Sequence, residues 1–156
     1  MSLIIDGTAG ATFPNSTVQA SAGSVLQVVS ATYATTTSTS STSLVNTGLT
    51  ASITPKFSTS KVLVFVTQQE CANSAVTTGL KLALLRNGSV IHTFAFYAGY
   101  ISNAANACYS TNYLDSPSTT SSVTYSTQFA VSTANGSCTV QNDSAVSTIT
   151  LLEIAA

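Results

Sequence analysis

The 156-residue sequence predicts an all-β protein, an antiparallel two-sheet β-sandwich that follows a short extended N-terminal segment. Ser and Thr occupy 51 of the 156 positions (25 Ser and 26 Thr), and these residues favour strands and turns over helix interiors. Short β-rich runs alternate with turn signals, and no stretch calls for a helix of more than a turn or two. The length suits one domain. We therefore place a short N-terminal segment at 1–22 and the sandwich at 23–156.

The predicted strands follow one another at short intervals. They cover the runs 25–33, 49–54, 61–67, 80–86, 89–97, 123–131, 137–141 and 147–154. The Ser/Thr tract 35–43 is expected to form an exposed loop or an edge. The run 61–67 is apolar at both strand parities, which predicts a central strand covered on both faces. The run 123–131 alternates large apolar residues with mostly polar ones, as a half-buried strand does.

Two Asn-Gly pairs are predicted to close β-hairpins. Asn87-Gly88 lies between the runs 80–86 and 89–97, and Asn135-Gly136 lies between 123–131 and 137–141. Asn-Gly is the strongest short-range hairpin signal, because both central positions of a type I′ turn need positive φ.

Charge is scarce throughout the chain. Four Lys or Arg and five Asp or Glu give a net charge of -1, and charged residues make up 6% of the sequence. An average soluble domain is about 25% charged, so the exposed surface here must consist of Ser, Thr, Asn and Gln. Four scattered cations cannot neutralise a run of phosphates, which excludes nucleic acid as a partner. No apolar run approaches the length of a membrane span, and no secretory signal is visible at the start.

Residues suited to catalysis do not cluster in the sequence. The single histidine, His92, shares strand parity with Phe94 and Phe96, which favours a packed or interface position over a general base. Folding could still bring Asp115 and Asp143 together as a glycosidase pair, although no close carboxylate pair exists in the sequence. We therefore expect a protein that is not an enzyme.

Cofactor and metal sites are not predicted either. The three cysteines show no zinc-site spacing, no acidic run resembles a calcium loop, and no cofactor is expected. Three small buried thiols in a reducing compartment are the favoured reading of the cysteines, with a disulfide as the alternative.

Tyrosines gather in one predicted loop, 97–113. We assign them as a candidate surface contact, since recognition concentrates on long loops, and their rings suit stacking on sugars. Of the two readings, sugar stacking is the alternative, and the favoured one is that the nearby phenylalanines fill the core and the tyrosines edge an oligomer contact. The candidate contact residues are Tyr97, Tyr100, Tyr109 and Tyr113.

Two parts of the sequence resemble bacteriophage proteins. The segment 10–19, Gly-Ala-Thr-Phe-Pro-Asn-Ser-Thr-Val-Gln, resembles the G-I-T-F-P-D-G-T-T-Q element found at shaft-to-head junctions of phage tail fibres, with Asn-Ser in place of Asp-Gly. Segments 25–29, 47–55, 60–64 and 149–156 are similar to a module common in phage virion proteins. The attachment residues that follow from this resemblance are Phe13, Pro14, Asn15, Thr17 and Gln19.

The resemblance implies a homotrimer of jelly-roll (TNF-like) sandwiches on the surface of a virion, made in the bacterial host cytoplasm. It carries no catalytic residues. Two roles follow. The first is a small tail fibre or receptor-binding protein that touches host surface glycans. The second is a capsid decoration (cement) protein that stabilises the phage head. In both roles the resemblance makes 1–22 an attachment and trimerisation segment, which binds other virion proteins of the tail or capsid.

Overall fold

The computed structural model describes residues 4–6, 10–12, 18–19, 24–99, 106–133 and 135–155, the first three ranges by their backbone alone. Within these residues the chain is strand, turn and a single short 3₁₀ helix, η1 (Asn142–Ser144). The strands are β1 (Ile4–Asp6), β2 (Gly10–Thr12), β3 (Val18–Gln19), β4 (Val25–Tyr33), β5 (Thr37–Thr39), β6 (Val45–Ile53), β7 (Lys61–Asn73), β8 (Leu80–Arg86), β9 (Ser89–Ala98), β10 (Ala107–Asp115), β11 (Val123–Val131), β12 (Cys138–Val140) and β13 (Ser147–Ile154).

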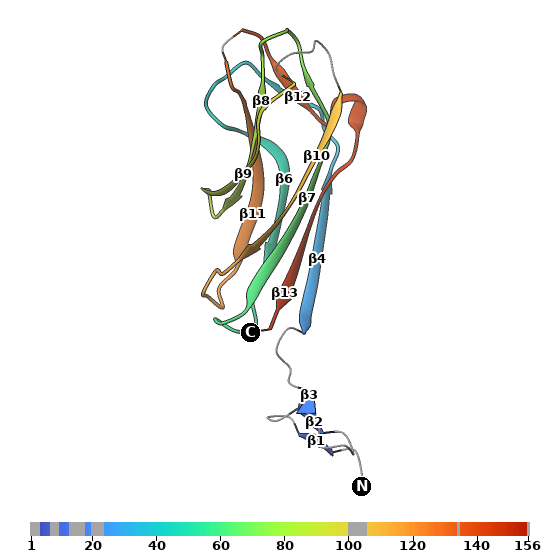
Figure 1. Ribbon diagram of the computed structural model, residues 1–156, viewed down its shortest axis with the longest axis vertical. Coiled ribbons are helices and arrows are strands. Elements are labelled where there is room, and N and C mark those ends of the chain that lie inside the picture. The colour runs from blue at the N-terminus through green and yellow to red at the C-terminus, as the bar shows by residue number, and fades with distance from the viewer. Residues whose placement is uncertain are drawn as a thin grey trace.

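From β4 onward the strands form an antiparallel two-sheet β-sandwich (Figure 1). One sheet has the order β6-β11-β8-β9. In the other, β7 pairs with β10 on one side and with β12 and β13 on the other. β4 pairs with β13, and β5 pairs with β12. We therefore count β4 and β5 as one interrupted strand, and β12 and β13 as another. Counted this way, eight strands in chain order form one sheet from strands 1, 8, 3 and 6 and another from strands 2, 7, 4 and 5.

Two apolar clusters fill the space between the sheets. One surrounds Tyr125 and Val64, and the other surrounds Phe129 and Leu82. Alternation along each strand produces this core, because every second residue of β6, β11 and β13 is buried. The predicted half-buried strand Val123–Val131 is confirmed at its stated bounds.

Buried polar side chains lie between the two clusters and bond to one another across the sandwich. Thr127 Oγ1 donates to Gln68 Oε1 at 3.2 Å, and Gln68 Nε2 donates to Ser147 Oγ at 2.9 Å. Thr47 and Thr127 share a hydroxyl hydrogen bond of 2.6 Å. Since each of these four residues is buried, the chain of bonds offsets the cost of removing their polar atoms from water.

The start of the first sandwich strand, β4, and the end of the last one, β13, lie together at one end of the molecule. The backbone N–H of Ala155 donates to the carbonyl of Ser24 at 2.9 Å, so β13 finishes where β4 begins. The three short strands β1, β2 and β3 form a separate antiparallel meander at this same end (Figure 1).

Several predicted elements are confirmed. The strands predicted at 25–33, 80–86 and 147–154 have those bounds in the structure. The Asn87-Gly88 hairpin joins β8 to β9, with φ of 48° and 81° at its two central residues. The Ser/Thr tract contributes β5, a three-residue edge strand, as expected for a loop or edge.

The second predicted hairpin is wrong. β11 pairs with β6 and β8, whereas β12 pairs with β5 and β7 in the opposite sheet. Gly136 lacks the positive φ that a type I′ turn requires at its second central position. The chain crosses between sheets here, because Cys138 and Val140 complete the apolar cluster around Phe129 from the facing sheet.

The predicted loop 97–113 is strand over its second half. β10 begins at Ala107 and pairs along β7 through eight positions, from Ala107 opposite Cys71 to Asp115 opposite Val62. Tyrosine and threonine at alternate positions provide the side chains that turn inward. β10 pairs with β7 on one side, so it is the edge strand of its sheet.

Candidate interaction surface

The outward face of the sheet that contains β7 carries a continuous apolar row. The strand register aligns four aliphatic side chains that alternate with the buried residues, one from each strand of the sheet. From β10 to β4 they are Leu114, Leu63, Leu152 and Val28. Leu114 is 51% exposed and Val28 is 58% exposed, while Leu63 and Leu152 are half-buried between them.

Phe65 widens this row on the central strand. It lies two residues beyond Leu63 on the same face of β7 and is 43% exposed. The prediction that 61–67 is central in its sheet is confirmed, but the prediction that both its faces are covered is wrong for the single chain. Val62, Val64 and Val66 fill the core, and the other face is left open. We call Leu114, Leu63, Leu152, Val28 and Phe65 the apolar face.

Hydroxyl pairs cover the sheets outside the apolar face. Ser110 donates to Thr67 at 3.2 Å between β10 and β7, and Ser30 and Thr150 share a hydrogen bond of 3.1 Å between β4 and β13. On the opposite sheet Ser52 and Thr124 are 2.8 Å apart. Cross-strand hydroxyl pairs stabilise neighbouring strands and satisfy one another without charge. They provide the neutral polar coat that the composition required.

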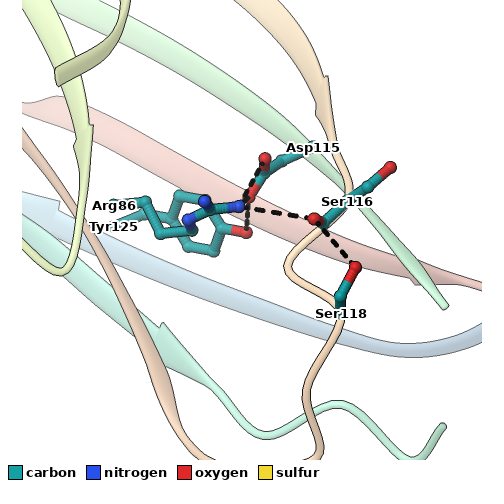
Figure 2. A network of polar contacts seen from close by, with 5 residues as sticks. All are labelled: Arg86, Asp115, Ser116, Ser118 and Tyr125. Atoms are coloured by element: carbon teal, nitrogen blue, oxygen red, sulfur yellow. Dashed lines mark hydrogen bonds and ion pairs between the residues drawn. The ribbon is translucent and has the colours of Figure 1, made fainter. Parts of the chain in front are cut away.

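An ion pair fixes β10 to the opposite sheet (Figure 2). Arg86 Nη1, at the end of β8, donates to both carboxylate oxygens of Asp115 at 2.9 Å, and to the carbonyl of Ser116 at 3.4 Å. The hydroxyl of Tyr125, on β11, donates to Asp115 Oδ2 at 2.7 Å. Burial raises the pKa of Tyr125, and its hydrogen bond to Asp115 raises the pKa further, so the phenol stays a neutral donor. Asp115 is therefore held by two strands of the opposite sheet, and it directly follows Leu114 of the apolar face.

A second buried carboxylate organises the end of the sandwich where β13 finishes. Glu153 is fully buried, and its carboxylate accepts from Gln27 Nε2 at 2.6 Å and from the backbone N–H of Lys56 at 2.7 Å. Burial acts to raise the pKa of Glu153, but the hydrogen bonds from Gln27 and the backbone N–H of Lys56 help to outweigh it, and the pKa is lowered. The ionised carboxylate thus ties β4, the 54–60 loop and β13 together.

The candidate carboxylates Asp115 and Asp143 do not come together as a pair in the structure. Asp115 pairs with Val62 near one end of β7, whereas Gln141, just before Asp143, donates to the carbonyl of Gln69. Seven residues of strand separate those positions by roughly 20 Å, much more than a glycosidase pair allows. The described residues contain no group of three or more metal-ligating side chains. They also contain no helix long and apolar enough to cross a membrane.

The predicted packed position of His92 is confirmed. Its ring stacks on Tyr113 with centroids 5.3 Å apart. The cysteine expectation holds for two of three residues: Cys71 and Cys138 are buried, Cys108 is exposed, and all three are free thiols.

The predicted contact tyrosines are in different environments. Tyr97 is exposed at the end of β9, whereas Tyr109 and Tyr113 are half-buried on β10 against the two apolar clusters. Tyr100 lies outside the described residues. The predicted attachment residues Phe13, Pro14, Asn15 and Thr17 also lie outside them, and Gln19 ends β3 opposite Ala11.

The sequence analysis missed the apolar face and the Arg86–Asp115 pair. Alternation from Cys108 to Leu114 was the available signal for the first, because it identifies β10 as a strand with Leu114 outward. Nothing in the sequence signals the pairing of Arg86 with Asp115, which are 29 positions apart.

These features define a neutral, hydroxyl-rich antiparallel β-sandwich with one open apolar face. No known family model matches the chain, and no curated protein matches it in sequence. Among solved structures, it is similar to the VP2 subviral particle of infectious bursal disease virus, with 15% identity, a TM-score of 0.42, and coverage of 83% of this chain and 38% of that one.

Two further solved structures come from the same virus. Its T=1 particles have 14% identity and a TM-score of 0.45, and the match covers 99% of this chain and 45% of that one. Its Gx strain has 16% identity, a TM-score of 0.38, and coverage of 83% and 37%. The chain thus spans less than half the length of the solved chains it matches.

Proposed function

We propose that this chain is a non-enzymatic structural protein of a bacteriophage particle, displayed on the virion surface as a homotrimer. The observation that carries the proposal is the apolar face, which crosses all four strands of one sheet and includes side chains 43% to 58% exposed. A contiguous exposed apolar surface marks an interaction site. The resemblance of segments 10–19, 25–29, 47–49, 52–55, 60–64 and 149–156 to phage virion proteins supplies the biological setting.

A second and a third copy of the same chain are the occupants that suit this face. The outward side chains that lie level with Lys61 to Thr67 on the four strands of this sheet include one charged group among the described residues. That group is Lys61, at the rim of the apolar face. Identical copies therefore meet without the like-charge repulsion that a charged face would cause. Burial in a trimer also provides the second covered face that the sequence of 61–67 predicts.

The strand order supports a jelly-roll fold for the subunit. An eight-stranded jelly roll consists of two four-stranded antiparallel sheets built from two Greek keys, and it is common in viral shells. The order 1-8-3-6 and 2-7-4-5 described above has that connectivity. In a TNF-like trimer of such subunits, the sheet built from strands 1, 8, 3 and 6 would supply the interface.

Of the two roles, the tail fibre or receptor-binding protein is favoured. The junction-like segment 10–19 and the position of β1–β3 at one end of the sandwich (Figure 1) suit a protein attached at that end, with the rest projecting outward. The alternative is a capsid decoration protein, which would stabilise the head by binding only the assembled shell. In either role residues 1–22 attach to other virion proteins.

Gold-labelled antibody against the protein, viewed by electron microscopy on intact phage particles, separates the two roles. Label at the tail is the expected result. Label spread over the head would overturn the fibre role in favour of decoration, and unlabelled particles would contradict both.

Deletion of residues 1–22 tests the division of labour within the chain. The truncated protein keeps the apolar face, which is proposed to hold the three copies together without help from 1–22. It should therefore remain a folded trimer by light scattering and lose its association with particles. Full-length protein that is a monodisperse monomer at micromolar concentration would contradict the trimer. Normal particle binding by the truncated protein would contradict the attachment role of 1–22.

A further inference from the structure

A β-bulge between β8 and β9 presents two aromatic rings beside a lysine. Leu80 pairs with Ala98 and Leu82 pairs with Ala95, so Lys81 alone stands opposite Phe96 and Tyr97. An extra residue in one strand re-aims the side chains at that point. Phe96 and Tyr97 are accordingly 56% and 48% exposed, where strict alternation would turn one of them inward.

The three side chains form a compact group. The ring centroids of Phe96 and Tyr97 are 4.5 Å apart with an interplanar angle of 85°, an edge-to-face contact. Lys81 Nζ lies 5.6 Å from the centroid of the Phe96 ring. Within the described residues the ion pair is Arg86–Asp115, and Lys81 has no carboxylate partner there. A cation and two exposed rings thus lie together on the surface of this sheet.

The backbone beneath this group is fixed. Tyr97 has φ of 56°, a left-handed conformation that is strained for a bulky residue. Gly79 permits it, because a Cβ at that position would lie 2.7 Å from the Tyr97 Cα. Buried Asn73 donates its side-chain Nδ2 to the carbonyl of Gly99 at 3.0 Å, just beyond the bulge. Strain that the surroundings hold in place is typical of sites that bind something.

We propose that Lys81, Phe96 and Tyr97 form a binding site for a carbohydrate that carries a carboxylate, such as a uronic acid. The apolar C–H face of a pyranose ring packs on the electron-rich face of an aromatic ring. The sugar carboxylate pairs with the Lys81 ammonium, which is held next to the Phe96 ring. This inference rests on the proposed receptor-binding role and specifies the chemical class of the receptor.

The test is calorimetric titration of the full-length protein with two matched probes. Cellotriose and the corresponding β-1,4-linked trimer of glucuronic acid differ in the oxidation state of C6. We expect the glucuronic acid trimer to bind at least about threefold more tightly, the contribution of one exposed ion pair, and added NaCl to remove that difference. Equal affinity for the two sugars, or binding of neither, would overturn the proposal.

Three variants assign the binding to this group. Phe96→Ala should weaken binding of the glucuronic acid trimer about tenfold, as loss of a central aromatic contact does. Tyr97→Gly should weaken it while keeping the bulge, because glycine adopts positive φ without strain. Lys81→Gln should abolish the preference for the acidic sugar and retain the weaker binding of cellotriose.

Matched controls lie at the other end of the sandwich. Phe57→Ala removes a phenylalanine that is also 56% exposed, and Lys61→Gln removes an exposed lysine, and neither should alter sugar affinity. Equal losses in control and test variants would overturn the site. If the full-length protein is found on phage tails but binds neither sugar, the sugar site is overturned and the proposed function stands. If it binds the acidic sugar but is absent from phage particles, the proposed function alone is overturned.

Discussion

Arg86 and Asp115 join the two sheets of the sandwich, with Arg86 Nη1 2.9 Å from each carboxylate oxygen of Asp115. Arg86 ends β8 in one sheet and Asp115 ends β10 in the other, so the pair closes the sandwich across its width. Tyr125 adds a third strand to the same carboxylate. β10 is an edge strand bound to one neighbour, and this pair gives it a second attachment.

Asp115→Asn should destabilise the fold by about 1–3 kcal/mol. The substitution removes the charge that Arg86 pairs with, and the figure is below that for a fully buried pair because the Arg86 side chain is 34% exposed. Urea denaturation measures the effect. The control is Asp143→Asn at an exposed carboxylate, which should change stability by less than about 0.5 kcal/mol. Similar losses in the two variants would contradict a special role for Asp115.

Val28→Lys should convert the trimer to monomer. Val28 belongs to the apolar face and is 58% exposed, so the fold tolerates the change, while each interface would bury a new charge. Light scattering coupled to size exclusion gives the mass. Val90→Lys, at a 49% exposed valine on β9 of the opposite sheet, is the matched control and should remain trimeric. A trimeric Val28→Lys variant would exclude this face as the interface.

Glu153→Gln should lower the melting temperature at neutral pH by about 5 °C and have much less effect in acid. The pKa of Glu153 is lower in the folded protein than its ordinary value of 4.5. Its contribution to stability is therefore complete above pH 4.5 and is lost as the pH falls through the folded value. Melting curves of both proteins across the acid range test this. A difference in melting temperature between the two proteins that stayed constant with pH would show that ionisation of Glu153 does not contribute to stability.

One of the three thiols should react with Ellman's reagent in the native protein. Cys108 is exposed, whereas burial raises the pKa of Cys71 to about 12 and that of Cys138 to about 11. Since the thiolate is the reactive form, the two buried thiols should titrate only after unfolding. Cys108→Ser should abolish the native reaction. Rapid reaction of two or three thiols per chain in the native state would contradict the burial of Cys71 and Cys138.

The sequence predicted the local strand pattern well and the pairing of strands less well. Strands such as 123–131 have their full side-chain alternation within nine residues, so their bounds are predictable. Asn135-Gly136 is a local turn signal, and a local signal carries no information on which sheet receives the next strand. Cys138 and Val140 take that strand to the facing sheet because the cluster around Phe129 has room for them there.

The two candidate sites could not be predicted in full from the sequence either, because both depend on which strands pair and in which register. The apolar face is assembled from residues of four strands, and its existence follows from their register. Tyr97 was named from the sequence, but the position of Lys81 opposite Phe96 and Tyr97 depends on a bulge that no sequence pattern predicts. Tyr109 and Tyr113 were grouped with Tyr97 as one loop, and the strand that contains them turns both toward the core instead.

The cross-strand hydroxyl pairs have a consequence for the conditions in which the protein works. Ser30 with Thr150 and Ser52 with Thr124 carry no charge and do not titrate near neutral pH. Neither dilution of the medium, which lengthens the Debye screening distance, nor a shift of some pH units alters the interactions of such a surface. Contacts made through these hydroxyl pairs should therefore depend little on salt concentration.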